Sequence, residues 1–295
     1  MKIAITGAGG FVGRELARFF SALHHVVALP RHSLDITDGH AVRRMITNVR
    51  PDLIINCAVL GLDDCEANPS MAHAVNVAGP QCLAEAAAEI DAEILSFSTN
   101  YVFDGKREAG SFYTNRDAAL PINKYGETKL AGELAVRMAA PKSYIIRTSW
   151  VFGAGKEDNF FGLAARALTE RKRLRAVTDV RASVTYVADL VSRIDEILSF
   201  HHYETYHVVN DGACSYYEFA LEVARDLRMS SAEIDSLIEA VTESEMRRNT
   251  SRPRYTPMRC LVSEELGLPA LRCWRTALSQ YLVGRLANLV IRTSD

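Results

Sequence analysis

The chain has 295 residues, which fits one large domain or two unequal ones. Hydrophobic residues make up 48% of it and charged residues 24%, a balance typical of a folded globular protein and unlike that of disordered or collagen-like chains. The formal net charge is -2, with no long run of either sign. Nucleic-acid binding depends on concentrated positive charge, so we expect no nucleic acid as a partner.

The start of the chain and the cysteine pattern point to the cytoplasm. The first apolar stretch reaches Gly7 too soon for the apolar region of a signal peptide. No run of about 18 apolar residues occurs, so we expect no membrane partner. The six cysteines form no C-x-x-C pair and the eight histidines have no metal-ligand spacing. No metal site is therefore predicted.

Short apolar runs alternate with helical patterns in the first half of the chain. This alternation indicates an α/β fold, a doubly wound parallel sheet with helices on both faces. The predicted strands are residues 2–6, 26–29, 53–57, 94–97, 144–147 and 205–209. The predicted helices include residues 12–23, 72–89, 124–138 and 187–200.

Helical patterns dominate after about residue 150. They cover residues 159–171, 231–240 and 270–290, and a further helix starts at a capping box near Ser215. We predict a dinucleotide-binding domain over residues 1–150, to which the chain returns around 177–209. A smaller, mainly helical substrate-binding domain is predicted from residues 151–176 and 210–295.

A glycine-rich turn joins the first predicted strand to the first predicted helix. Gly7, Gly10 and Gly13 have the spacing for a tight turn, a close approach of backbone to phosphate, and close packing of helix on strand. The helix N-terminus would present free N–H groups to a pyrophosphate. We therefore predict a Rossmann-type dinucleotide site formed by Gly7, Gly9, Gly10, Phe11, Val12 and Gly13.

Two residues after the second predicted strand bear on the choice of cofactor. Arg31 could pair with the 2′-phosphate of NADPH, because a guanidinium binds phosphate through two hydrogen bonds. Asp35 stands about 20 residues beyond the turn, where an acidic side chain would hold a ribose 2′-hydroxyl instead. NADPH is the predicted cofactor, and NADH stays open.

Tyr125 and Lys129 lie four residues apart at a predicted helix start, so both project from one face. A phenol has a pKa of about 10, and a neighbouring ammonium is expected to lower that pKa toward the working range of a proton donor. Thr99 follows a predicted strand, so its hydroxyl would emerge at the carboxyl edge of the sheet, where ligands bind. Thr99, Tyr125 and Lys129 are the predicted catalytic residues.

Six segments of the chain resemble the extended short-chain dehydrogenase/reductase superfamily, and more closely the dTDP-4-dehydrorhamnose reductase family. They appear in the order of the family and together span the first half of the chain. The segments are TGAGGFVG (6–13), LDITD (34–38), RPDLIINCA (50–58), STNYVFDG (98–105), YGETKLAGE (125–133) and RTSWVFG (147–153).

The resemblance implies a reaction and a set of residue roles. Thr99, Tyr125 and Lys129 would form a catalytic triad in which Tyr125 delivers the proton. Hydride would pass from nicotinamide C4 to the C4 ketone of a nucleotide-linked 6-deoxyhexose, with dTDP as the expected carrier. Tyr125 and Lys129 would also touch the cofactor. The resemblance places the rest of the cofactor path at Asp35, Ile36, Asn56, Ala58 and Asn76.

The substrate side departs from the family pattern. Asn100 stands where the family usually has Asp, and an amide can orient a ligand but cannot exchange a proton as a carboxyl does. This argues against the elimination chemistry of a sugar 4,6-dehydratase. Residues 179–185 also depart from the family. The predicted substrate contacts are Asn100, Trp150 facing the sugar, and Arg252, which either reaches a nucleotide diphosphate or is a solvated loop residue.

Two other functions stay open. A nucleotide-sugar epimerase would retain bound NAD and consume no cofactor, and Arg31 argues against it. A non-catalytic subunit, similar to the regulatory subunit of methionine adenosyltransferase, would not need the set of Thr99, Tyr125 and Lys129. We therefore expect an NADPH-dependent reductase with a nucleotide-sugar substrate. The oligomeric state is left open, with a homodimer as the candidate.

Overall fold

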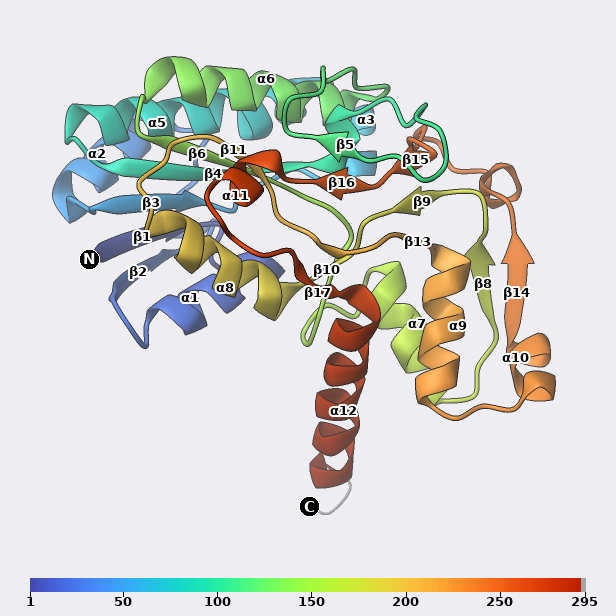
Figure 1. Ribbon diagram of the computed structural model, residues 1–295. Helices are drawn as coiled ribbons and strands as arrows, with labels where there is room; N and C mark the ends of the chain where they lie inside the picture. Colours follow the sequence, from blue (N-terminus) through green and yellow to red (C-terminus); the bar gives the residue numbers. More distant parts are fainter. Residues whose placement is uncertain (293–295) are drawn as a thin grey trace.

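Six parallel strands form the central sheet of the computed structural model, which describes residues 1–292 (Figure 1). The strand order is β11-β6-β4-β3-β1-β2. All six lie within a residue or two of the predicted strands, and the predicted doubly wound α/β fold is confirmed. The strands are β1 (Lys2–Thr6), β2 (His25–Leu29), β3 (Leu53–Asn56), β4 (Glu93–Thr99), β6 (Ser143–Thr148) and β11 (Thr205–His207).

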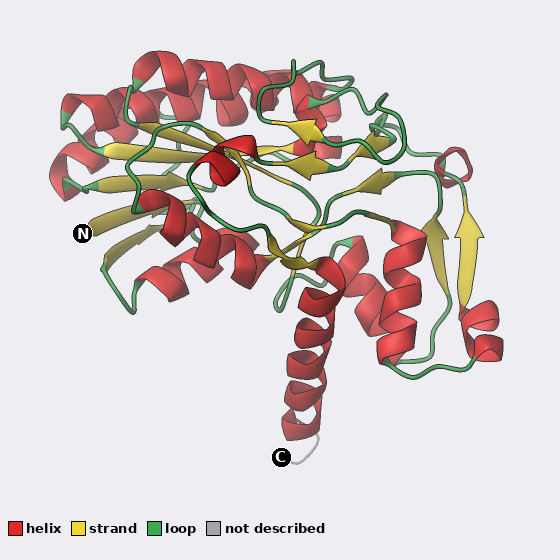
Figure 2. Ribbon diagram, in the orientation of Figure 1, coloured by secondary structure: helices red, strands yellow, loops and turns green. Residues whose placement is uncertain are grey.

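Helices cover both faces of this sheet, because its central strands are apolar on both sides. Ile3 and Ile5 belong to the core under α1 and α8, whereas Ala4 between them belongs to the core under α2, α5 and α6. Figure 2 shows the strands between these two helical layers. The helices are α1 (Phe11–Phe20), α2 (Gly39–Val49), α5 (Gly79–Glu89), α6 (Lys124–Ala139) and α8 (Val187–Leu198); α2 is a helix beyond those predicted.

The segment between β3 and α5 is more broken than predicted. The helix expected over residues 72–89 is interrupted by a π-helical turn, Ala74–Ala78, which separates α4 from α5. The turn lies where α6 comes closest, because a Cβ on Gly132 would stand 2.1 Å from the Asn76 carbonyl oxygen. Such turns often occur near functional sites. The short helices before it are α3 (Leu62–Ala67) and α4 (Pro69–His73).

Most of the remaining helices and short strands lie in the second half of the chain. The helices are α7 (Phe160–Thr169), α9 (Tyr216–Asp226), α10 (Ser231–Leu237), α11 (Leu261–Glu265) and α12 (Trp274–Arg292). Single 3-10 turns span Asn100–Val102 and Glu243–Met246. The short strands are β5 (Tyr113–Thr114), β7 (Val151–Phe152), β8 (Leu174–Val177), β9 (Arg181–Ala182), β10 (Thr185–Tyr186), β12 (Asn210–Asp211), β13 (Cys214–Ser215), β14 (Ile238–Val241), β15 (Tyr255–Thr256), β16 (Met258–Arg259) and β17 (Leu271–Cys273).

Two helix predictions in this half are wrong at one end. The helix expected over residues 231–240 ends at Leu237, and β14 follows it, paired in parallel with β8. Ile238 and Val241, the ends of β14, are buried, so this segment packs as a strand. The helix expected from residue 270 begins at Trp274, because β17 precedes it and pairs with β12.

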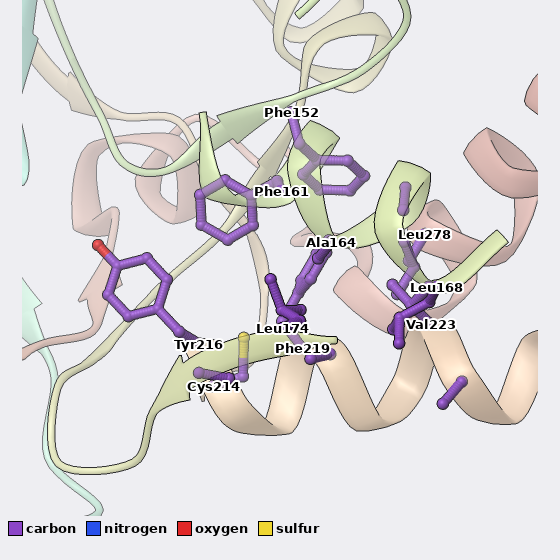
Figure 3. Packing of buried hydrophobic residues seen from close by; sticks show 14 of the residues in the cluster. Phe152, Phe161, Ala164, Leu168, Leu174, Cys214, Tyr216, Phe219, Val223 and Leu278 are labelled. Carbon is purple, nitrogen blue, oxygen red and sulfur yellow. The ribbon is translucent and has the colours of Figure 1, made fainter. Parts of the chain in front are cut away.

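A third core, rich in aromatic rings, holds the second half together (Figure 3). The Phe161 and Phe219 ring centroids lie 4.8 Å apart in an edge-to-face arrangement, and Trp274 stacks on Phe219. Val180 and Val184, in the segment 179–185, are buried in this core. The boundaries of the predicted domains stay a prediction. Within residues 1–292, no helix is long and apolar enough to cross a lipid bilayer.

Trp274 anchors the start of α12, which supplies a test of this core. Its side chain is fully buried, so we expect Trp274→Ala to lower the free energy of unfolding by about 3–5 kcal/mol, measured by urea denaturation. Val283 on the same helix is 69% exposed and serves as the control. Val283→Ala should change stability by less than about 0.5 kcal/mol. Equal effects of the two changes would contradict the described packing of α12.

Candidate active site

The glycine-rich turn lies between the ends of β1 and β3, where the strand order of the sheet reverses. Gly7 has a φ of +63°, and a Cβ there would stand 2.6 Å from the Ala58 backbone nitrogen. A Cβ on Gly13 would stand 2.5 Å from the Gly7 carbonyl oxygen. Side chains are therefore excluded at Gly7 and Gly13, which lets the turn pack closely on the loop after β3 and on the start of α1, as in turns that bind a pyrophosphate at a helix N-terminus.

A pocket of about 260 Å³ lies beside this turn. It includes seven of the predicted cofactor residues: Gly7, Gly9, Gly10, Arg31, Asp35, Ile36 and Ala58. Five further residues complete its apolar wall and are not among the predictions: Leu34, Cys57, Val59, Leu60 and Val75. Residues 57–60 directly follow β3 at the carboxyl edge of the sheet, so their place in the chain is a signal that could have identified them.

Arg31 and Asp35, the two candidates for the cofactor ribose, lie together at this pocket. The Arg31 Nε atom is 3.7 Å from an Asp35 carboxylate oxygen, and the Arg31 side chain is 79% exposed. Asp35 is more firmly held, because its carboxylate accepts hydrogen bonds from the Thr37 N–H and hydroxyl. These bonds lower the pKa of Asp35. Arg31 is therefore free to turn toward an anion, while Asp35 keeps a negative charge beside it.

Four predicted cofactor residues lie next to the pocket but not in its wall. Asn56 accepts hydrogen bonds from the Thr6 hydroxyl and the Ala58 N–H, which fixes the end of β3 against β1. Asn76 accepts from the Leu60 N–H and donates to the Leu60 carbonyl, which shapes the loop after β3. The remaining residues are half-buried members of the core beneath α1: Phe11 and Val12.

Thr99, Tyr125 and Lys129 come together where α6 begins against the end of β4. Asn123 caps α6 by accepting a hydrogen bond from the Gly126 N–H, at 2.8 Å. A Cβ on Gly126 would stand 2.2 Å from the Tyr101 carbonyl oxygen, so only glycine lets the helix approach the segment after β4 this closely. Tyr125 is half-buried, and Lys129 is only 5% exposed.

Burial, rather than the charge of Lys129, dominates the titration of Tyr125. Desolvation raises the pKa of the phenol to about 12, and a hydrogen bond with Thr99 only partly offsets this rise. Lys129 is not among the groups that lower it. The expected acidification of Tyr125 is therefore wrong. The larger consequence falls on Lys129, because burial lowers the pKa of its ammonium to about 8.

The predicted substrate residues fall into two groups. Asn100 is buried and donates to the Thr256 hydroxyl at 2.7 Å, so its amide joins the segment after β4 to β15. Trp150 is half-buried and stacks on Tyr216, with ring centroids 4.0 Å apart. Arg252 is not a solvated loop residue, because its side chain is only 13% exposed.

Arg252 belongs to a polar cluster next to the catalytic residues. It hydrogen-bonds the buried phenol of Tyr101, whose ring meets the Tyr125 ring edge-on with centroids 5.7 Å apart. Glu243 lies 3.6 Å from Arg252 and 3.0 Å from Arg248. The Arg252 Nη1 atom is buried without a hydrogen-bond partner. Tyr101, Glu243 and Arg248 are not among the predicted residues, and only Tyr101 had a signal, its place directly after the Thr99-Asn100 pair.

The close approach at Gly126 can be tested by adding one methyl group. We expect Gly126→Ala to lower the free energy of unfolding by about 1–3 kcal/mol, because the new Cβ would overlap the Tyr101 carbonyl. Gly284 on α12 has open space around it and is the matched control. Gly284→Ala should raise stability by about 0.5–1 kcal/mol, since alanine favours a helix interior. A stabilising effect of Gly126→Ala in urea denaturation would contradict the described contact.

Comparisons with known proteins agree with this architecture. The family described as RmlD substrate binding domain matches residues 1–286. The dTDP-4-dehydrorhamnose reductase of Mycolicibacterium smegmatis is 38% identical over 94% of this chain and 84% of its own length. The spore coat polysaccharide biosynthesis protein SpsK of Bacillus subtilis is 35% identical over 96% of this chain and 98% of its own.

A solved structure extends the likeness to the whole fold. The dTDP-4-dehydrorhamnose reductase of Bacillus anthracis, solved in complex with NADP, superimposes with a TM-score of 0.89 at 30% identity. The match covers 96% of this chain and 99% of that one. These findings confirm the resemblance drawn from the six segments. The chain belongs to the RmlD substrate binding domain family, the family of the dTDP-4-dehydrorhamnose reductases.

Proposed function

We propose that the protein is an NADPH-dependent reductase that transfers hydride to the C4 ketone of a dTDP-linked 4-keto-6-deoxyhexose. One observation carries the proposal above the others. The half-buried phenol of Tyr125, the Thr99 hydroxyl and the buried ammonium of Lys129 lie together at the carboxyl edge of a dinucleotide-binding sheet. The names and the NADP complex of the relatives support the same chemistry.

The cofactor fits the residues present. The Gly7 backbone packs against the loop after β3, where a Cβ would stand 2.6 Å from the Ala58 nitrogen, and Gly7, Gly9 and Gly10 line the adjoining pocket, which suits a pyrophosphate. Ile36 and Ala58 supply an apolar wall for the adenine, and the exposed Arg31 guanidinium suits a 2′-phosphate. Because Asp35 keeps its negative charge at the same mouth, NADH is the second cofactor to test. A bound NADPH supplies the hydride.

Tyr125 acts as the proton donor in this proposal. Its raised pKa keeps the phenol protonated at neutral pH, as a general acid must be. When the ketone carbon gains the hydride, its C=O π bond opens and the oxygen takes the phenol proton. This transfer is favourable because an alkoxide is a stronger base than a phenolate. Thr99 orients the ketone oxygen, and the Lys129 ammonium stabilises the phenolate and holds the cofactor ribose.

The substrate contacts follow from the cluster around Tyr101. The Arg252 Nη1 atom makes no hydrogen bond and lies 3.6 Å from a Glu243 carboxylate oxygen, and a guanidinium with a free N–H suits a diphosphate oxygen. Trp150 offers its half-buried ring to the sugar. Asn100 supports the site without contacting the substrate in this proposal, because its amide donates a hydrogen bond to the Thr256 hydroxyl. The Asn100 geometry thus suits a reductase, which needs no second acid there.

The compartment and assembly are part of the proposal. All six cysteines are free, which suits a reducing compartment, and we place the protein in the cytoplasm. A homodimer stays a prediction. Since SpsK is a polysaccharide biosynthesis protein, synthesis of cell-surface sugars is the process that we propose.

An absorbance assay of reduced nicotinamide with a dTDP-linked 4-keto-6-deoxyhexose tests the function. The protein should consume NADPH, and Tyr125→Phe should lower kcat by about 10²–10⁴-fold, because a positioned general acid is lost. NADPH binding should weaken much less than kcat falls, because only one hydroxyl contact to the cofactor is removed. Tyr203→Phe is the control, since that phenol donates to Glu93 away from the site. Full activity of Tyr125→Phe would exclude the mechanism, and retained cofactor without net oxidation would favour an epimerase.

The pH dependence separates the roles of Lys129 and Tyr125. Lys129 has a pKa of about 8 and Tyr125 of about 12, so kcat/KM for NADPH should fall as pH rises through about 8, where Lys129 loses its charge. Lys129→Arg should move this decline to higher pH, because a guanidinium stays protonated. A decline that Lys129→Arg leaves in place would show that another group titrates.

A further inference from the structure

A buried ion pair lies behind the catalytic residues and has no role in the proposed mechanism so far. Glu133 and Arg147 are 6% and 7% exposed, the most buried ion pair in the part of the chain that the structure describes. The Arg147 Nε atom donates to Glu133 Oε1 at 2.9 Å, and Nη2 donates to Oε2 at 2.6 Å. A guanidinium therefore holds both oxygens of one carboxylate.

The pair joins the three elements that build the site. Glu133 lies on α6 one turn after Lys129, and Arg147 lies near the end of β6. Ser98, the residue before Thr99 on β4, donates its hydroxyl to Glu133 Oε1. The Glu133 carboxylate is thus tied to β4 and β6, while it sits on the same helix as Lys129.

Glu133 is the carboxylate that acts on the buried ammonium. Three groups favour the charged form of Lys129, and the largest effect comes from Glu133. The other two are the thiols of Cys65 and Cys57, whose own pKa values burial raises, so both stay neutral near pH 7. Arg147 is not among the groups that act on the Lys129 pKa. Glu133 is therefore the source of negative charge that opposes the cost of burying Lys129.

Stability alone does not explain this pair. Replacing a buried ion pair by apolar residues of similar size is often neutral or stabilising, because desolvation of both ions offsets their attraction. The Arg147 Nη1 atom also lacks a hydrogen-bond partner, and its guanidinium packs 5.3 Å from the Phe103 ring centroid. A charge kept at this cost suggests a task outside folding.

We propose that Glu133 is a positioning residue that acts through Lys129: its carboxylate, fixed by Arg147 and Ser98 one helical turn away on α6, keeps the Lys129 ammonium charged beside Tyr125. The inference rests on the proposed reductase function. Glu133 acts through Lys129 and touches neither substrate nor cofactor. Arg147 and Ser98 serve to fix the carboxylate through hydrogen bonds to its two oxygens.

Glu133→Gln tests this role, because the amide keeps the shape and one acceptor oxygen but removes the charge. Two quantities are measured across pH: the NADPH Kd by fluorescence, and kcat/KM. Each should change with pH at a midpoint where Lys129 loses its charge. In Glu133→Gln this midpoint should lie about one pH unit lower than in the wild type. Well below that midpoint, kcat should stay within a few-fold of the wild-type value. Glu133→Asp, which keeps the charge, should bring both midpoints most of the way back to their wild-type values.

The matched control is Asp189→Asn. Asp189 is also held through both oxygens by an arginine, Arg272, at 2.8 Å each, but it lies on α8 away from Lys129. This change should lower stability without moving either midpoint. If Glu133→Gln does not fold, the double variant Glu133→Gln/Arg147→Met replaces the pair without leaving a buried charge, and the same downward shift is expected.

The possible outcomes separate the two proposals. A wild-type protein that does not oxidise NADPH with the keto sugar fails the proposed function. An active wild type whose midpoints are unchanged in Glu133→Gln, or in the double variant, overturns the role of Glu133. A shift of equal size in Asp189→Asn also overturns it, because the effect would then follow from lost stability rather than from lost charge beside Lys129.

Discussion

The site depends on the burial of one lysine against the carboxyl edge of the sheet. Removing the Lys129 ammonium from water lowers its pKa to about 8, and the same burial raises the pKa of Tyr125 to about 12. The result is a neutral phenol beside a cation that titrates close to neutral pH. In the proposed reaction this division is useful, because the phenol keeps its proton until the ketone oxygen needs it.

Close packing of α6 produces that burial. The helix approaches the Tyr101 carbonyl at Gly126 and the Asn76 carbonyl at Gly132, at distances that no larger residue would allow. The Glu133 carboxylate then joins the helix to the two strands that flank the site. Backbone contact thus sets the position of the helix, and one buried ion pair sets the charge around its lysine. The glycine turn follows β1, which β3 separates from β4, and it lines the dinucleotide pocket at the same edge of the sheet.

Much of the fold and part of the site were predictable from the sequence. Continuous apolar runs reveal buried parallel strands, so all six strands of the main sheet were found. The spacing of Tyr125 and Lys129 showed that they share a helix face. The start of β14 was missed because its strand character depends on pairing with β8, about 60 residues earlier, and local pattern carries no sign of a distant partner.

The spacing of residues in the sequence does not show how deeply each side chain is buried. The sequence placed a cation near Tyr125, but the sign of the pKa change depends on how much water the fold removes from the phenol. In the same way, the sequence left open whether Arg252 is a solvated loop residue, and the structure shows that its side chain is largely buried beside Tyr101. The family resemblance implies that Asn56 and Asn76 line the cofactor path, and the structure shows their amides in hydrogen bonds that shape the loops.

The titration of the lysine side chains is the most direct test of this account. The chain has only seven lysines, so their ε-carbon signals can be resolved by NMR in protein labelled with ¹³C-lysine and assigned with Lys129→Arg. The account predicts that the Lys129 signal titrates near pH 8. If the Lys129 signal titrates only above about pH 10, the ammonium is not desolvated and the central claim is wrong.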